Sequence, residues 1–341
     1  MKILFKSLLI GALAGLTVSG GARAGSARPL NIVATTPELG SLASAVAGER
    51  GRVRTITSGG EDPHFLQARP SFMVMARDAD LWIRMGLDLE VGWEPVLLDG
   101  ARNRNIRVGQ PGHFDAGSFI PYVLDVPEAG ATRAMGDVHP SGNPHYLTDP
   151  LNARSVATAL ADRLIDLDPA HAGVYRSGLK DFLSRLDRAM FGAGPVERLG
   201  ADRLWTAESE GNLRELLEAE EALTDLEGWR GAMRPWQDRP IITFHKSWGY
   251  FARRFDLKIA AELEPLPGVP PSPAHLARMI DLANAREVSL ILREPFYPAR
   301  PADFVARETG ARVAVANTYG SDDSADGYFR LMDSIVAAFG E

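Results

Sequence analysis

Short apolar runs alternate with amphipathic stretches along the first part of the chain. Residues 30–35 and 81–85 form mainly apolar runs typical of buried strands, whereas residues 37–47 begin with a proline and end before Gly48, as a helix does. Strands that alternate with helices predict a parallel sheet flanked by helices on both faces. The same pattern predicts further strands at residues 52–57 and near residues 106–108, and helices from residue 71 and over residues 91–98.

From residue 150 the pattern changes to long helices. Residues 151–167 are amphipathic, the pattern is interrupted at Asp168 and Pro169, and it resumes over residues 170–190. A helix of about 20 residues spans roughly 30 Å. The segment is therefore either a stiff connector between two lobes or an ordinary packed helix. The acidic stretch 192–239 is partly helical and carries no motif of its own.

The alternation of strands and helices returns after residue 239. Strands are predicted at residues 240–244, 257–261, 288–292 and 313–316, and helices at residues 248–255, 274–285, 301–309 and 326–339. A second parallel sheet implies a second lobe, with a cleft between the two. We expect an α/β fold of two lobes, each with a parallel sheet flanked by helices. Its parts are an N-terminal lobe at residues 25–168, a connecting helix at residues 169–192 and a C-terminal lobe at residues 193–341.

The first residues have the features of an export signal. Lys2 and Lys6 precede an apolar core at residues 8–18 and a small-residue cleavage motif, which predicts a signal peptide at residues 1–24. The chain has no cysteine, which excludes disulfides, thiolate metal ligands and a lipid-modified cysteine. We therefore expect a periplasmic protein without a lipid anchor. The net charge of −7 argues against a nucleic-acid partner.

Histidines carry the predicted chemistry of this chain. The turn-rich segment GDVHPSGNPHYLTDP holds His139 and His145, while His64 (EDPHF) and His245 (FHKSW) follow predicted strands. Ligands of open parallel sheets bind beyond the carboxyl ends of the strands, so we expect His64, His145 and His245 to converge in the cleft. Neutral imidazoles suit Zn(II). The alternative for each of them is a solvated loop histidine.

A carboxylate from the second lobe would complete a tetrahedral zinc site. Asp322 and Asp323 are the candidates because their loop follows the last predicted strand, and capping of the final helix is their alternative role. His139 is either an auxiliary metal-capturing residue or a solvated one. Three carboxylates are expected to orient imidazoles rather than bind the ion: Glu61, Asp62 and Asp149. His113 is expected to be solvated, with metal capture as its alternative role, and His171 and His275 are expected to be structural.

Several separate motifs resemble one protein family. EDPHFLQARPS, NPHYLTDPLNA, ITFHKSWGYFARRFDL, EPLPGVPPSPAHLARMIDLANAREVSLILREPFY and FVARETGARVAV occur in the order found in the cluster A-I, TroA-like metal-binding proteins, which serve ABC importers of zinc and manganese. The resemblance covers nearly all of the chain after residue 24. It implies two lobes joined by one long helix, a metal ion between the lobes, and delivery of this ion to an inner-membrane permease.

The resemblance also implies a ligand set. The histidines of the family's DPH, NPH and YHxxxxYF motifs correspond to His64, His145 and His245. The fourth ligand of many members is an aspartate before the last helix, and it corresponds to the loop that holds the two candidate aspartates. The loop is short here, so water, His139 or Glu61 remains an alternative. The His/Asp-rich tract of many zinc-binding members is absent.

These features predict a periplasmic solute-binding protein, a monomer and not an enzyme, that captures Zn(II) for an ABC importer. Three histidines favour zinc, because the manganese carriers of this family resemble a site with two histidines and two carboxylates. An exported zinc hydrolase is the alternative from another class, but the HExxH motif is absent. A manganese carrier and a surface adhesin are two further possible functions.

Overall fold

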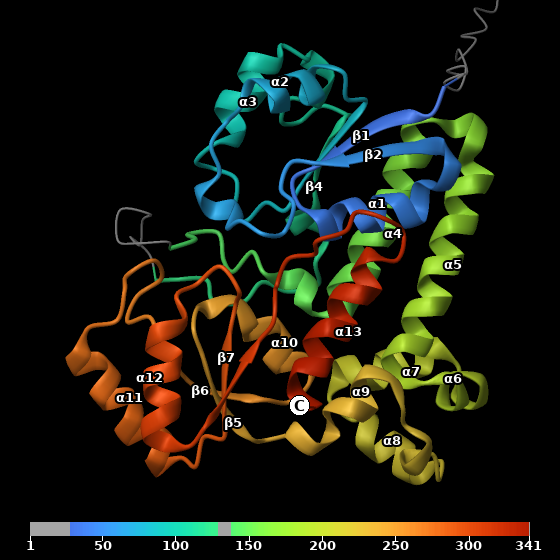
Figure 1. Cartoon of the computed structure of the whole chain (residues 1–341). Coiled ribbons are helices and arrows are strands. Elements are labelled where there is room, and N and C mark those ends of the chain that lie inside the picture. The colour runs from blue at the N-terminus through green and yellow to red at the C-terminus, as the bar shows by residue number, and fades with distance from the viewer. Residues whose placement is uncertain (1–27, 129–137, 341) are drawn as a thin grey trace, which may run out of the picture.

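The computed structural model describes residues 28–128 and 138–340 of the 341-residue chain. The predicted signal peptide at residues 1–24 lies outside the described residues. Two four-stranded sheets, with strand orders β2-β1-β3-β4 and β6-β5-β7-β8, form two lobes (Figure 1). All neighbouring strands within each sheet are parallel. The predicted α/β fold of two lobes, each with a parallel sheet flanked by helices, is confirmed.

The N-terminal sheet is covered on both faces. Its main elements are β1 (Leu30–Ala34), α1 (Pro37–Ala47), β2 (Gly51–Thr55), α2 (Pro70–Arg77), β3 (Leu81–Arg84), α3 (Glu94–Ala101) and β4 (His113–Asp115). Ile32 and Val33 of the central strand are both fully buried. Ile32 lies in a core with residues of α1, whereas Val33 lies in a separate core with residues of α2 and α3. Burial on both faces explains why this strand is a continuous apolar run.

The last strand of this sheet is displaced from its predicted position. The strand predicted near residues 106–108 is wrong, since Ile106 ends a short 3₁₀ helix and β4 pairs with β3 instead. Gly112 precedes β4, and a Cβ atom there would lie 2.6 Å from the carbonyl oxygen of Asn105. This close approach requires glycine. A strand of three residues is too short to produce a hydrophobic period, so no local pattern predicts it.

The C-terminal sheet repeats the arrangement. Its elements are β5 (Pro240–Thr243), α10 (Gly249–Arg254), β6 (Lys258–Glu262), α11 (Pro273–Ala285), β7 (Leu290–Arg293), α12 (Ala299–Thr309), β8 (Arg312–Val315) and α13 (Gly327–Gly340). Ile242 of the central strand lies in a core with residues of α11 and α12, and Ile241 lies in the large core that both lobes share. Each lobe therefore has an outer core of its own and one face on a common core.

Two long helices follow the first lobe, and the second of them passes both lobes. The predicted helical stretch is broken at Asp168 and Pro169 into α4 (Pro150–Leu167) and α5 (Ala172–Phe191). In Figure 1, α5 runs along one side of the molecule past both lobes, and it packs against α1 in the first lobe and α9 in the second. Gly178 permits this packing, because a Cβ atom there would lie 2.4 Å from the carbonyl oxygen of Val46.

The acidic stretch after α5 forms a helical layer beside the C-terminal sheet. It contains α6 (Ala193–Leu199), α7 (Ala201–Glu210), α8 (Leu213–Ala219) and α9 (Gly228–Met233). Trp205 and Met233 place this layer in the common core. Among the helices of the described residues, none is both long and apolar enough to cross a membrane.

Candidate metal centre

His64 is held at the cleft by the residues just before it. It lies in a 3₁₀ turn, η2 (Pro63–Phe65), and its side chain is buried. Oδ1 of Asp62 accepts a hydrogen bond from the backbone N–H of His64 at 3.0 Å and lies 2.5 Å from Nδ1 of the same residue. Burial raises the pKa of Asp62, but the hydrogen bond and charge of His64 outweigh this and lower it. Asp62 therefore stays ionised and orients the imidazole, as the sequence predicts.

His145 is held, like His64, by the side chain two residues before it, which here is a neutral asparagine. Oδ1 of Asn143 accepts from the backbone N–H of His145 at 2.9 Å and lies 2.8 Å from Nδ1. The amide nitrogen of Asn143 donates to the backbone carbonyl of Lys246 at 2.7 Å, so this turn is tied to the second lobe. Burial, followed by the charges of the neighbouring histidines, lowers the pKa of His145 well below its ordinary value. The imidazole is therefore neutral at physiological pH, the state that binds metal ions.

His245 extends from the sheet of the C-terminal lobe. It directly follows β5 and Phe244, and it is buried. Its Nδ1 lies 2.7 Å from Oε2 of Glu264, a residue that follows the neighbouring strand β6. A carboxylate on Nδ1 fixes the tautomer and ring orientation of a histidine and leaves the lone pair of Nε2 for a metal ion.

Four histidine rings gather where the lobes meet. The ring centre of His64 lies 4.9 Å from that of His139, 5.4 Å from that of His145 and 6.1 Å from that of His245. The rings of His145 and His245 are 5.6 Å apart. Imidazoles bound to one zinc ion through nitrogens about 2.0–2.1 Å from it have their ring centres roughly 5 Å apart. Within residues 28–128 and 138–340, however, no set of three or more histidine, aspartate or glutamate side chains is already in ligand geometry.

The two candidate aspartates of the last loop differ in which of their atoms make contacts. Asp322 forms an ion pair with Arg330 of α13 and accepts from the backbone N–H of Ser324 at 2.8 Å. The backbone carbonyl of Asp323 accepts from the hydroxyl of Ser44 in α1 at 2.6 Å. These contacts hold the loop against α1 and α13, and metal ligation by Asp322 or Asp323 stays a prediction.

Two of the three carboxylates expected to orient imidazoles contact other groups instead. Glu61 accepts from the backbone N–H and hydroxyl of Ser58. Asp149 is fully buried and caps α4 by accepting from the backbone N–H of Leu151. Only Asp62 has the expected role. The partners that sequence reasoning missed are Asn143 and Glu264, and only Asn143 lies near its histidine in the chain.

The remaining histidines lie in structural positions. His113 is buried in β4, where its Nε2 lies 3.7 Å from Oε1 of Glu94, so the expected solvated role is wrong. Nδ1 of His171 lies 2.8 Å from Oδ2 of Asp168 at the break between α4 and α5. The backbone N–H of His275 donates to the hydroxyl of Ser272 at the start of α11.

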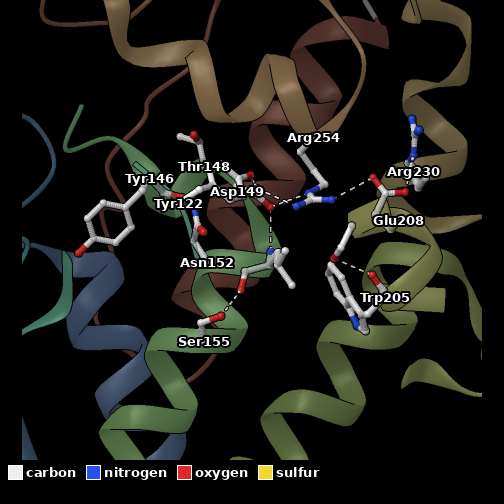
Figure 2. Close-up of polar contacts among 12 residues, drawn as sticks. Tyr122, Tyr146, Thr148, Asp149, Asn152, Ser155, Trp205, Glu208, Arg230 and Arg254 are labelled. Atoms are coloured by element: carbon white, nitrogen blue, oxygen red, sulfur yellow. Dashed lines mark hydrogen bonds and ion pairs between the residues drawn. The ribbon is translucent and has the colours of Figure 1, made fainter. Parts of the chain in front are cut away.

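A buried ion-pair network holds the segment that follows His145. Figure 2 shows the guanidinium of Arg254 between the carboxylates of Asp149 and Glu208. Arg254 donates to Asp149 twice, at 2.7 and 3.0 Å, and Glu208 also pairs with Arg230 at 3.1 Å. Asp149 belongs to the same motif as Asn143, whereas Arg254 belongs to α10 of the second lobe. The network therefore fixes the interlobe loop to the C-terminal lobe.

Comparison with known proteins places this geometry in a family. A family model described as "Zinc-uptake complex component A periplasmic" matches residues 32–190 and 206–341. The chain belongs to this family. The predicted resemblance to TroA-like binding proteins is thereby confirmed, and members of the family are substrate-binding components of ABC importers, not enzymes. The protein is thus a metal-binding solute-binding protein whose partners are a metal ion and a membrane permease.

Individual relatives differ in the metal that their names state. The "Iron-binding protein YfeA" of Yersinia pestis is 23% identical over 337 residues, which cover 93% of this chain and 88% of the relative. A crystal structure of ZnuA aligns with a TM-score of 0.65 at 21% identity, covering 91% of this chain and 99% of the other. FpvC of Pseudomonas aeruginosa in complex with Mn²⁺ aligns with a TM-score of 0.64 at 21% identity, covering 92% and 99%. The family therefore establishes a metal cargo, while the choice of metal depends on the residues of this chain.

Proposed function

We propose that this family member captures Zn(II) between its lobes, with His64, His145 and His245 as nitrogen donors, and delivers it to an ABC importer. The observation that carries the proposal is the convergence of these three rings from three separate segments. Each ring has its Nδ1 against an oxygen, from Asp62, Asn143 or Glu264. Rings oriented in this way lose little freedom when an ion binds.

The donor set favours zinc over manganese. Neutral imidazole is a borderline donor that suits Zn(II), whereas Mn²⁺ prefers carboxylate, carbonyl and water oxygens. At position 245 this chain has a histidine, which offers a nitrogen donor, and not an acidic residue, which would offer an oxygen donor. The low pKa of His145, caused first by burial, keeps one donor neutral without help from the metal.

His139 is proposed to act at the entrance of the site. A cleft of about 210 Å³ leads to the histidines, and His139, His145 and His245 line it together with Asp125 and Lys246. His64 is absent from this lining, and His139 has the largest exposed fraction of the four histidines, 9%. An ion that enters this cleft meets His139 early, so its imidazole can capture the ion before the three inner histidines hold it.

The cellular setting follows from the family and from expectations of the sequence. We propose that residues 1–24 direct export and are removed, that the chain has no lipid anchor, and that it works as a monomer in the periplasm. The two lobes both face the cleft, so a permease that contacts both could receive the ion when they separate. Mass spectrometry of the protein purified from a periplasmic extract would show whether processing occurs after residue 24.

Isothermal titration with zinc tests the proposal. The purified protein is stripped of metal and compared with His64→Ala, His145→Ala and His245→Ala, each of which should weaken zinc binding at least 100-fold. His171→Ala is the matched control, because it removes an imidazole that binds Asp168 outside the cleft. Parallel titrations with Mn²⁺ and Fe²⁺ decide the cargo. Tighter binding of Mn²⁺ than of Zn²⁺, or unchanged zinc binding in His145→Ala, would contradict the proposal.

A further inference from the structure

Three neighbouring strands of the C-terminal sheet bring three ionisable residues to one edge. Thr243 at the end of β5 is in register with Glu262 of β6 and with Leu292 of β7. Two residues farther along each chain segment lie His245, Glu264 and Glu294. The backbone hydrogen bonds from Glu264 to Phe244 and from Phe244 to Leu292 continue this register past the strand ends. His245 is therefore flanked by one glutamate on each side.

The carboxylates of the two glutamates differ in their hydrogen bonding. Glu264 has its Oε2 on Nδ1 of His245. Glu294 is fully buried, and neither of its carboxylate oxygens has a hydrogen-bond partner among the described residues. Its backbone carbonyl, in contrast, accepts from Arg293 at 2.9 Å, so the main chain is fixed while the carboxylate is not. A buried carboxylate without a partner is unfavourable, so this group is suited to a partner that is added on binding.

The position of Glu294 places it beside His245. It follows Leu292 by two residues, as His245 follows Thr243, and Thr243 and Leu292 are paired in the sheet. The hydroxyl of Ser247 is also near its carboxylate without reaching hydrogen-bond geometry. On the other side of β7, Ala316 lies at the position that matches Glu294, and the next residue, Asn317, donates from its amide to the backbone carbonyl of Gly59 at 2.6 Å.

We propose that Glu294 is the oxygen donor that completes the metal site. This inference rests on the proposed function and adds a ligand and a determinant of metal choice to it. An ionised carboxylate offsets part of the charge of a divalent cation in a buried site, which three neutral imidazoles cannot do. It also supplies a hard donor, so Glu294 contributes more to the binding of Mn²⁺ than to the binding of Zn²⁺.

Substitution of Glu294 tests the inference. Zinc and manganese titrations compare the parent protein with Glu294→Gln, which keeps the shape of the side chain and removes its charge. Glu38→Gln is the matched control, because Glu38 is equally buried, has one oxygen without a partner among the described residues, and has a pKa raised by burial to about 7. Glu294→Gln should weaken zinc binding at least tenfold and manganese binding more, while Glu38→Gln should match the parent.

A crystal structure of the zinc-loaded parent protein gives a second test that does not depend on the folding of a variant. An oxygen of Glu294 should lie about 2.0–2.2 Å from the ion. The inference is overturned if this carboxylate lies outside bonding distance, or if Glu294→Gln binds both metals as the parent does. Loss of binding in His245→Ala would then still support the proposed function. A parent protein that binds no divalent cation would instead refute the proposed function itself.

Discussion

Nδ1 of His245 lies 2.7 Å from Oε2 of Glu264, although 19 residues separate the two in the chain. The carboxylate fixes the ring of a proposed zinc ligand, so Glu264→Ala should weaken zinc binding about 10- to 100-fold without removing a ligand. Glu264→Gln keeps a hydrogen-bond acceptor for His245, so it should lose less zinc affinity than Glu264→Ala. Isothermal titration measures both, with the exposed Glu287→Gln as control. Equal affinities for Glu264→Ala and the control would show that the contact does not support the site.

Zinc should raise the thermal unfolding temperature of the protein. A ligand that binds the folded state at about 100 times its Kd stabilises that state by about 2.7 kcal/mol. Differential scanning fluorimetry should show the rise for the parent and for His171→Ala, and EDTA should reverse it. The rise should be absent for His145→Ala at the same zinc concentration. A rise of equal size in His145→Ala would locate the bound zinc elsewhere.

The buried pair of Asp149 and Arg254 should matter for stability more than for metal affinity (Figure 2). Removal of one partner leaves a buried charge unpaired, so Arg254→Leu should lower the free energy of unfolding by about 3–5 kcal/mol. Adding Asp149→Asn to Arg254→Leu should restore part of the loss. Urea denaturation measures both variants. Arg214→Ala, which removes an exposed helix pair with Glu218, should leave the urea midpoint unchanged.

Glu38 should make the parent protein less stable as the pH rises. Burial raises the pKa of Glu38 in the folded state to about 7 from an ordinary value of 4.5. The folded state binds this proton more tightly than the unfolded state does. The protonated carboxyl therefore contributes its full stabilisation below pH 4.5, and this contribution is lost as the pH rises through about 7. The difference corresponds to about 3 kcal/mol.

The matching variant isolates this effect from other titrating groups. Glu38→Gln cannot ionise, so its free energy of unfolding relative to the parent should increase between about pH 5 and pH 8. Urea denaturation of both proteins at the two pH values measures the change. A constant difference between parent and variant over this range would show that the carboxyl of Glu38 titrates normally.

Local patterns in the sequence were enough for most elements and for the histidines. The apolar run of β1 and the proline that begins α1 predict those elements because burial and helix ends depend on nearby residues. His64 and Asp62 lie two residues apart, and one 3₁₀ turn brings them together, so their pairing was also predictable. The short strand β4 was not predictable. Its three residues are too few to show a strand pattern, and its pairing with the distant strand β3 defines it as a strand.

The sequence by itself determined the two α/β lobes, the export signal as an expectation, and the three histidines proposed to bind the ion. Only the tertiary structure decided what surrounds them: Glu264 and Glu294 beside His245, and Asp322 and Asp323 at α13 and α1. The physical reason is that side-chain neighbours at a sheet edge are set by strand register. Register joins residues that are distant in the chain, and no local hydrophobic period records it.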